Sequence, residues 1–127
     1  MMSRMRVLVA LADPASQRAL SNLLPLHDAE PVFATTMREA RAVLASGPVA
    51  LVVCEDCLID GSYRDLLPVA QAARGDVPVV VTSRTDNPEE YLEAMKLGAF
   101  DFVAAPFSRT ELDRIVHNAL HRAVAAF

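Results

Sequence analysis

The sequence predicts a three-layer α/β domain in which five parallel strands alternate with five helices in a doubly wound sheet. Short apolar runs recur along the chain, and the segments between them space their apolar side chains as helices do. Several of these runs are apolar at nearly every position, as in parallel strands that helices cover on both faces. The repeated strand-then-helix order predicts right-handed crossovers, with helices on both sides of the sheet.

Five segments have the composition of strands. They are residues 6–12, 31–34, 49–54, 77–83 and 100–104. The first run and the fourth are almost wholly aliphatic, and the fourth is mostly β-branched, which favours central positions in the sheet. In such sheets ligands bind beyond the carboxyl ends of the strands, so we expect a functional site where these runs end.

Capping residues mark the starts of the expected helices. The helices cover approximately residues 14–25, 37–47, 62–73, 88–97 and 109 to the C-terminus. Side chains that accept hydrogen bonds from a first helical turn precede four of them, namely Asp13, Thr36, Asn87 and Ser108. Pro68 lies inside the third helix, and because proline lacks an N–H it predicts an interruption or a kink there.

Composition places the chain among folded, soluble proteins. It has 127 residues, of which 53% are apolar and 22% charged, enough apolar material for the core of one domain spanning residues 1–127. The net charge of −4 argues against direct nucleic-acid binding, which needs a positive face. No apolar run approaches the roughly 20 residues of a membrane span. The lack of such a run and the presence of only two cysteines both favour a cytoplasmic location.

The two cysteines, Cys54 and Cys57, form a CxxC pair that could be a redox or metal motif. Cys54 lies inside an expected strand, and the two acidic residues between the cysteines disfavour a thiolate. His27, His117 and His121 show no ligand spacing with the pair; the last two are four apart, which is typical of a solvated helix face. No motif of a nucleotide-binding loop or a hydrolase occurs, so we expect no enzymatic activity.

Two blocks of sequence resemble the receiver domain of bacterial two-component response regulators. RVLVALADP is similar to that family's first strand and PVVVTSRTDNPEEYLEAMKLGAFDFVAAPF to its fourth and fifth strands, with GAFDFVAAPF the most specific part. The resemblance covers essentially the whole chain. It implies a flavodoxin-like fold with strand order 2-1-3-4-5. It also implies a site in which an aspartate accepts a phosphoryl group beside Mg²⁺, a hydroxyl and a lysine.

The resemblance places the family's acidic pair at Leu11 and Ala12, which carry no carboxylate. Asp13 remains the nearest acidic side chain, and it has an ordinary explanation as a helix cap. Because Mg²⁺ prefers oxygen ligands in octahedral geometry, we expect an impaired Mg²⁺ site and no cofactor.

The acceptor position corresponds to Glu55, with Asp56 as the alternative register. A glutamate holds its carboxylate one methylene, about 1.5 Å, further from the backbone, which misplaces a nucleophile and leaves a fixed negative charge. The lysine position holds Ala105, and the chain has a single lysine, Lys96, in the fourth helix. Electrostatic stabilisation of a transferring phosphoryl group would therefore be lost.

Other family positions are retained. Thr82 matches the hydroxyl that contacts the phosphoryl group, and Phe102 matches the aromatic residue that switches conformation. The bond before Pro106 is typically cis in the family, so we expect a cis Ala105–Pro106 bond. The resemblance thus implies that the surface that binds partners is retained, whereas the phosphorylation site has lost several of its side chains.

The sequence leaves two functional hypotheses open. One is a degenerate receiver that signals through protein contacts without aspartyl phosphorylation; the other is a working phosphoacceptor that uses Asp56 or Glu55 with Mg²⁺. The expected partner is a histidine kinase, an output domain or another receiver, bound at the fourth helix, fifth strand and fifth helix. A homodimer is a further candidate, whereas membrane contact is not expected. Whether these residues form a complete protein or an excised module stays open.

Overall fold

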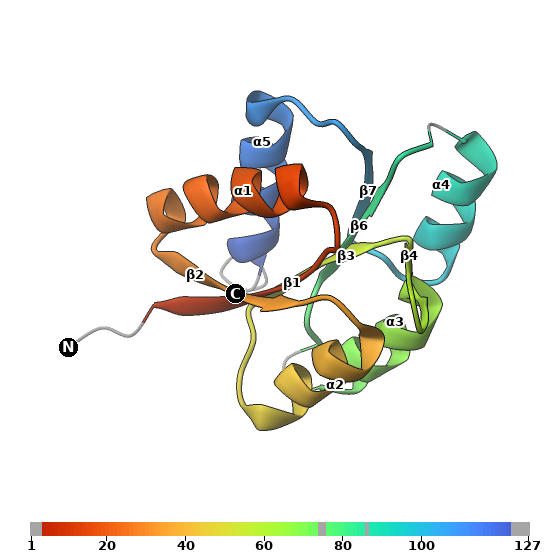
Figure 1. The fold of residues 1–127 in the computed structure, drawn as a ribbon, viewed down its shortest axis with the longest axis horizontal. Helices are drawn as coiled ribbons and strands as arrows, with labels where there is room; N and C mark the ends of the chain where they lie inside the picture. Colours follow the sequence, from red (N-terminus) through yellow and green to blue (C-terminus); the bar gives the residue numbers. More distant parts are fainter. Residues whose placement is uncertain (1–3, 74–75, 86, 123–127) are drawn as a thin grey trace.

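A five-stranded parallel sheet forms the middle of the molecule (Figure 1). The computed structural model describes residues 4–73, 76–85 and 87–122. The strands are β1 (Met5–Ala10), β2 (Ala29–Ala34), β3 (Leu51–Glu55), β6 (Val79–Ser83) and β7 (Asp101–Ala104). They lie in the order β2-β1-β3-β6-β7. This confirms the predicted order, because the labels β4 (Cys57–Leu58) and β5 (Gly61–Ser62) belong to a separate small hairpin.

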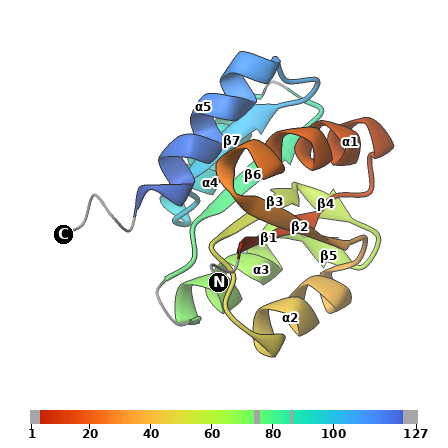
Figure 2. The ribbon, with the colours of Figure 1, turned by 90° about the vertical axis from the view of Figure 1, so that its left-hand side faces the viewer.

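Helices cover both faces of the sheet (Figures 1 and 2). They are α1 (Pro14–Leu23), α2 (Met37–Ser46), α3 (Tyr63–Ala72), α4 (Pro88–Lys96) and α5 (Arg109–Leu120), with a 3₁₀ turn, η1 (Leu24–His27), after α1. α1 and α5 pack on one face, and α2, α3 and α4 on the other. The predicted doubly wound, three-layer architecture is therefore confirmed. Val124, part of the expected fifth helix, lies outside the described residues.

The sheet separates two apolar cores because successive side chains of a strand point to opposite faces. Val7, Val9 and Leu11 pack with α1 and α5, whereas Leu8 and Ala10 pack with α2 and α3. Leu11 continues this alternation just beyond the end of β1 and is fully buried. The position that the resemblance assigns to an acidic ligand therefore belongs to the core.

All four predicted caps are made. The side chains of Asp13, Thr36, Asn87 and Ser108 each accept a hydrogen bond from the first turn of the helix that follows. Each cap satisfies a backbone N–H that has no partner within its helix.

Several expected boundaries differ. α1 ends two residues before Pro25, because the chain tightens into η1 there, and β2 begins two residues before Pro31. The expected interruption at Pro68 is not found, since α3 continues through it as one helix with Pro68 exposed. Because proline has no backbone N–H, Pro68 removes only one hydrogen bond from the helix.

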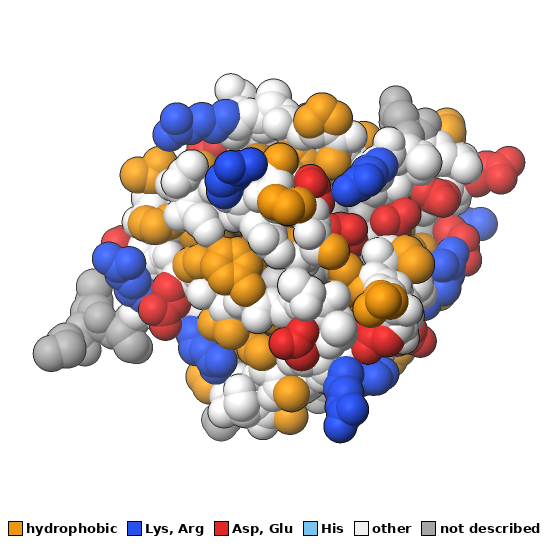
Figure 3. Space-filling model, in the orientation of Figure 1, with side chains coloured by type: hydrophobic (Ala, Val, Ile, Leu, Met, Phe, Trp, Pro, Cys, Tyr) orange, Lys and Arg blue, Asp and Glu red, His pale blue; other side chains and the backbone are white. Residues whose placement is uncertain are grey.

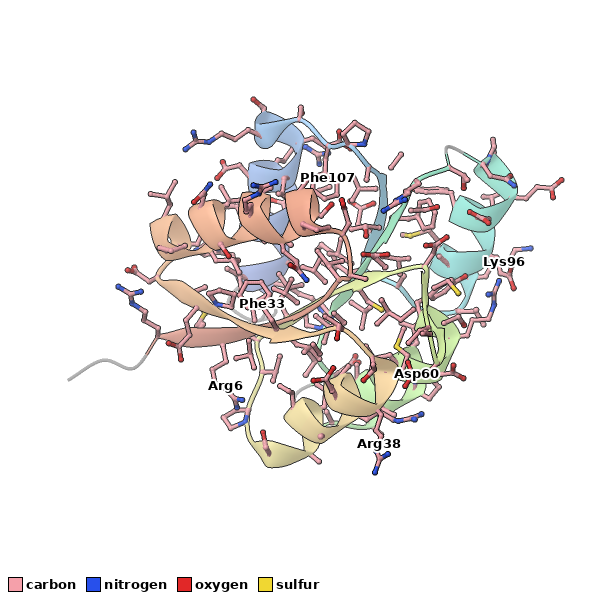
Figure 4. All side chains as sticks on the ribbon, viewed as in Figure 1. Arg6, Phe33, Arg38, Asp60, Lys96 and Phe107 are labelled. Atoms are coloured by element: carbon pink, nitrogen blue, oxygen red, sulfur yellow. The ribbon has the colours of Figure 1, made fainter. Side chains whose placement is uncertain are left out.

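The segment after β3, expected to be a simple loop, forms the β4–β5 hairpin and holds the start of α2. The Asp60 carboxylate at its tip accepts hydrogen bonds from Met37 N (2.6 Å) and Arg38 N (3.0 Å). Figure 4 shows Asp60 beside the end of α2 that carries Arg38. These two N–H groups hold the pKa of Asp60 below its usual value. Asp60 thereby fixes the hairpin to α2.

β2 forms one edge of the sheet and carries Pro31 in its middle. It pairs only with β1 among the described strands, with Pro31 opposite Val7. Phe33, on the same strand, is 45% exposed (Figure 4).

No helix among the described residues is long and apolar enough to span a membrane.

Candidate functional site

A pocket of about 360 Å³ lies at the carboxyl ends of the central strands, where the fold predicts a site. Loops after β1, β3, β6 and β7 meet there. The pocket is lined by Asp13, Ser16, Glu55, Asp56, Cys57, Thr82, Ser83, Arg84, Thr85 and Ala105. The structure therefore brings together the five residues discussed for the phosphoryl and metal site, Asp13, Glu55, Asp56, Thr82 and Ala105, and places Cys57 of the CxxC pair beside them.

The Glu55 side chain bridges the ends of two strands. Its Oε1 atom accepts hydrogen bonds from Ala12 N (2.6 Å) and Asp13 N (2.8 Å), two consecutive amides of the turn between β1 and α1. Hydrogen bonds to an ionised acceptor are among the stronger ones in proteins. The carboxylate at the end of β3 is thus directed at the β1–α1 turn and is held there by two backbone donors.

Asp13 serves the helix that follows it. Its Oδ2 atom accepts hydrogen bonds from Ser16 Oγ (2.6 Å) and Ser16 N (3.3 Å), and Arg84 Nη2 lies 3.8 Å from Oδ1. The hydroxyl of Ser16 is the main cause that lowers the pKa of Asp13 below its usual value. Asp13 is therefore a charged cap whose lone pairs are shared between Ser16 and a guanidinium.

A second polar network lies on the α4 side of the pocket. Ser83 Oγ donates to Asp56 Oδ2 (3.2 Å) and lies 3.0 Å from Thr85 Oγ1, which in turn donates to Glu90 Oε2 at 2.8 Å. Ser83 itself is almost wholly buried. These bonds connect the loop after β3 to the first turn of α4.

Neighbouring strands place Thr82 beside Glu55. The two residues are register partners in the β3–β6 pair, and Asp56 N donates to Thr82 O at 2.7 Å. Thr82 is 2% exposed and lines the pocket. The register puts Glu55, rather than Asp56, directly opposite Thr82.

The far side of the pocket is closed by the chain after β7. The Ala105–Pro106 peptide bond is cis, as the resemblance implied, and Ala105 N donates to Ser83 O at 2.6 Å. Ala105 contributes only a methyl group to the pocket lining. The basic residue that lines the pocket is Arg84, 78% exposed at its side chain, whereas Lys96 lies at the end of α4 (Figure 4).

Phe102, on β7, lies away from the pocket and packs under α4. Its ring meets that of Tyr91 edge-on, with centroids 6.1 Å apart and planes at 89°. Phe102 and Tyr91 line a shallow groove with Asn87, Pro88, Ala104 and Glu111 between the starts of α4 and α5. The aromatic position thus belongs to the α4–β7–α5 surface.

The two cysteines do not form a reactive pair. Both are free, with Cys54 buried in β3 and Cys57 exposed on β4. Desolvation by burial, reinforced by the acidic neighbours Glu55 and Asp56, raises the pKa of Cys54 and keeps it a thiol.

The chain is similar in sequence to response regulators. It is 30% identical over 119 residues to the response regulator protein PilR of Pseudomonas aeruginosa, covering 94% of this chain and 27% of that protein. It is 32% identical over 114 residues to the DNA-binding transcriptional regulator NtrC of Rhizobium meliloti, covering 90% of this chain and 24% of that protein. The chain thus spans about a quarter of the length of these curated relatives. No family model matches it.

Solved structures decide the fold. A CheY-like response regulator receiver domain from Methanospirillum hungatei superposes with a TM-score of 0.86 at 19% identity, covering 98% of this chain and 100% of that one. The chain has the receiver-domain fold. The beryllofluoride-activated receiver domain dimer of NtrC4 gives 0.80 at 24% identity, covering 94% of this chain and 97% of that one.

Three residues that line the pocket of this receiver fold were not anticipated as site residues: Ser16, Arg84 and Thr85. Arg84 and Thr85 directly follow the strand predicted over residues 77–83, so their place after a central strand was an available signal. Ser16 lies one turn into α1 and is buried against Asp13. Its bonds to the cap Asp13, three residues earlier, are local contacts, so the spacing of these two residues was an available signal as well.

Proposed function

We propose that this chain is a receiver domain of a two-component response regulator that signals through protein contacts without aspartyl phosphorylation. The observation that carries the proposal is the engagement of Glu55 with Ala12 N and Asp13 N. The family resemblance assigns Glu55 to the acceptor position, and its place opposite Thr82 supports that assignment over Asp56. A carboxylate held by two amides acts here as a fixed structural anion.

The residues of the pocket do not suit Mg²⁺, which favours near-octahedral oxygen coordination. Leu11 is buried in the core and Ala12 offers a methyl group. Asp13 is engaged by Ser16 and Arg84. Among the described residues, no three acidic, histidine or cysteine side chains are arranged to hold a metal ion. We therefore propose that the Mg²⁺ site is impaired.

The output of such a domain would pass through the α4–β7–α5 surface. Tyr91 is 42% exposed above Phe102, and Leu92 on the same helix is 56% exposed. Acidic side chains gather over α4 in the space-filling view, where the helix carries Glu89, Glu90 and Glu93 (Figure 3). We propose a protein partner for this surface, such as a histidine kinase, an output domain or another receiver, in the cytoplasm.

The network between the pocket and α4 supports this route. Asp56, Ser83, Thr85 and Glu90 form a continuous chain of hydrogen bonds from the loop after β3 to the first turn of α4. A change of charge at the pocket would shift α4 between two conformations only if the charge interacted differently with each of them. Because the Glu55 carboxylate is permanent, the charge at this position stays constant.

The test is an amide NMR titration with Mg²⁺ followed by beryllofluoride, which mimics an acyl phosphate without turnover. We expect no saturable shifts at Asp13, Glu55 and Thr82. Saturable shifts there that extend to Phe102 would overturn the proposal and support a working phosphoacceptor that uses Glu55 or Asp56.

A matched variant provides the positive control. The triple substitution Ala12→Asp, Glu55→Asp and Ala105→Lys restores three family positions, of which residue 12 is exposed and residue 105 half-buried, so both accept the larger side chains. We expect this variant to show Mg²⁺-dependent shifts that the native chain lacks. If it stays as silent as the native chain while remaining folded, the three restored side chains alone do not explain the loss.

A further inference from the structure

The pocket at the strand ends carries more negative than positive charge. Its lining includes the carboxylates of Asp13, Glu55 and Asp56, whereas its basic lining residue is Arg84, which lies 3.8 Å from Asp13. Among the residues that the structure describes, neither Glu55 nor Asp56 forms an ion pair. Both are half-buried, and partial burial of a carboxylate without a counter-charge is unfavourable. The pocket therefore favours the approach of a cation.

Glu55 and Asp56 each keep one carboxylate oxygen free. The two amides that bind Glu55 both donate to its Oε1 atom. Ser83 Oγ donates to Oδ2 of Asp56. Within the described ranges, no hydrogen bond reaches Glu55 Oε2 or Asp56 Oδ1. Two anionic acceptors thus remain available to a donor that enters the pocket.

Thr82 points to a ligand independently of the charges. It lines the pocket although only 2% of the residue is exposed, and its hydroxyl forms no hydrogen bond with any described residue. The neighbouring Ser83 hydroxyl, in contrast, contacts both Asp56 and Thr85. Buried hydroxyls usually have a partner. Since Thr82 is the register partner of Glu55 and accepts a backbone bond from Asp56, it supplies a third acceptor beside the two carboxylates.

From these acceptors we propose that the pocket binds a primary ammonium group, such as the end of a lysine side chain of a partner protein. An ammonium carries one positive charge and three N–H donors, which match the negative lining and the three acceptors of Glu55, Asp56 and Thr82. It needs only hydrogen-bonding distances of about 2.8 Å, whereas Mg²⁺ requires a near-octahedral oxygen shell at about 2.0 to 2.1 Å. A pocket of about 360 Å³ has room for the ammonium and its alkyl stem.

A lysine bound in this pocket comes from another molecule. The single lysine of the chain, Lys96, ends α4 and does not line the pocket (Figure 4). The inference rests on the proposed function, because a pocket that held Mg²⁺ and a phosphoryl group would leave no place for the ammonium. It adds that the partner is recognised at the strand ends as well as at the α4–β7–α5 surface.

The test is an amide NMR titration with n-butylammonium chloride near pH 7, in about 150 mM NaCl so that weak surface attraction is screened. We expect saturable shifts at Glu55, Asp56 and Thr82, with a Kd on the order of 1 to 10 mM for a ligand of so few atoms. Two analogues serve as controls. N-Butylacetamide lacks the charge and tetramethylammonium lacks N–H donors, so neither should produce saturable shifts at these residues.

Matched variants assign the binding to the acceptors. Glu55→Gln removes a charge and Thr82→Val removes a hydroxyl, both with little change of shape, and each should weaken the affinity at least about fivefold. Glu30→Gln, at an exposed carboxylate of β2 outside the pocket, should leave the affinity unchanged. Circular dichroism and melting temperature check that each variant is folded. Because the Thr82 hydroxyl has no partner among the described residues, Thr82→Val provides the test if Glu55→Gln is unstable.

Two further ligands distinguish the possible sources of the ammonium. Nα-acetyl-lysine N′-methylamide represents a lysine within a protein, and 1,4-diaminobutane represents a free diamine. Affinity for the blocked lysine equal to or above that for n-butylammonium supports a partner's lysine. A preference of about tenfold for the diamine would overturn that source.

The proposal as a whole is overturned by a lack of saturation up to about 100 mM n-butylammonium, or by an affinity that neither Glu55→Gln nor Thr82→Val changes. The proposed function fails by a different result, namely saturable shifts with Mg²⁺ and beryllofluoride in the absence of any amine. A chain that is silent to both titrations would therefore refute the ammonium site alone.

Discussion

Replacing Glu55 by alanine tests whether this carboxylate has a structural role. The substitution removes the acceptor of two amide hydrogen bonds, of 2.6 and 2.8 Å, one at the exposed Ala12 and one at the half-buried Asp13. A hydrogen bond to a charged group contributes about 1.5 to 3 kcal/mol when protected from water. Because water can replace the acceptor here, we assign about 1 kcal/mol to each bond, or about 2 kcal/mol in total.

The assay is urea and thermal unfolding of the native chain, Glu55→Ala, Glu55→Asp and a control at an exposed carboxylate of β2, Glu30→Ala. We expect Glu55→Ala to lower the melting temperature by about 7 °C, from about 2 kcal/mol at this chain length. Glu55→Asp, one methylene shorter, should recover less than half of the loss. A Glu55→Ala variant within about 0.5 kcal/mol of the native chain would refute the reasoning, since that is the spread of ordinary surface substitutions.

Three further outcomes are expected. Hydrogen bonds from Met37 and Arg38 lower the pKa of Asp60, so the stability that Asp60 contributes is present above about pH 4 and is lost as the pH falls through the lowered value. Asp60→Asn should therefore reduce the fall in the free energy of unfolding at acidic pH, and an unchanged fall would contradict this. Leu11→Asp buries a carboxylate in the core beside α1, so it should lower the free energy of unfolding, measured by chemical denaturation, by about 4 kcal/mol without creating Mg²⁺ binding. A stable variant that binds Mg²⁺ would count against the placement of residue 11 in the core. The Tyr63 hydroxyl is buried without a protein partner, so Tyr63→Phe should leave the free energy of unfolding within about 0.5 kcal/mol or raise it; a clear loss would point to a bridging water.

The fold was predictable because its signals are local. Most strands of the sheet contain a short apolar run, and the caps at Asp13, Thr36, Asn87 and Ser108 are short-range patterns that the structure reproduces. Parallel pairing and layer order then follow from general rules of chain connection. The β4–β5 hairpin escaped prediction because each strand has two residues, too few for any periodicity.

The candidate site was only partly predictable. The strand ends predicted where the site lies, because the position of a residue along a strand fixes which end of the sheet it approaches, and the family resemblance then assigned Glu55, Asp56 and Thr82. The bonds that Glu55 accepts from the turn after β1 depend on a side-chain rotamer and on the close approach of Asp13 and Glu55, which are 42 residues apart. Such distant contacts have no local sequence pattern.

Pro31 has a consequence for the behaviour of the molecule at high concentration. An outer strand exposes backbone donors and acceptors that can recruit a strand from another copy, which starts aggregation. Pro31, in the middle of β2, has no N–H and interrupts any ladder that would extend along this strand. The partly exposed Phe33 two residues later would otherwise favour such stacking. Pro31 thus protects this edge of the sheet from self-association while β2 remains paired with β1 on its other side.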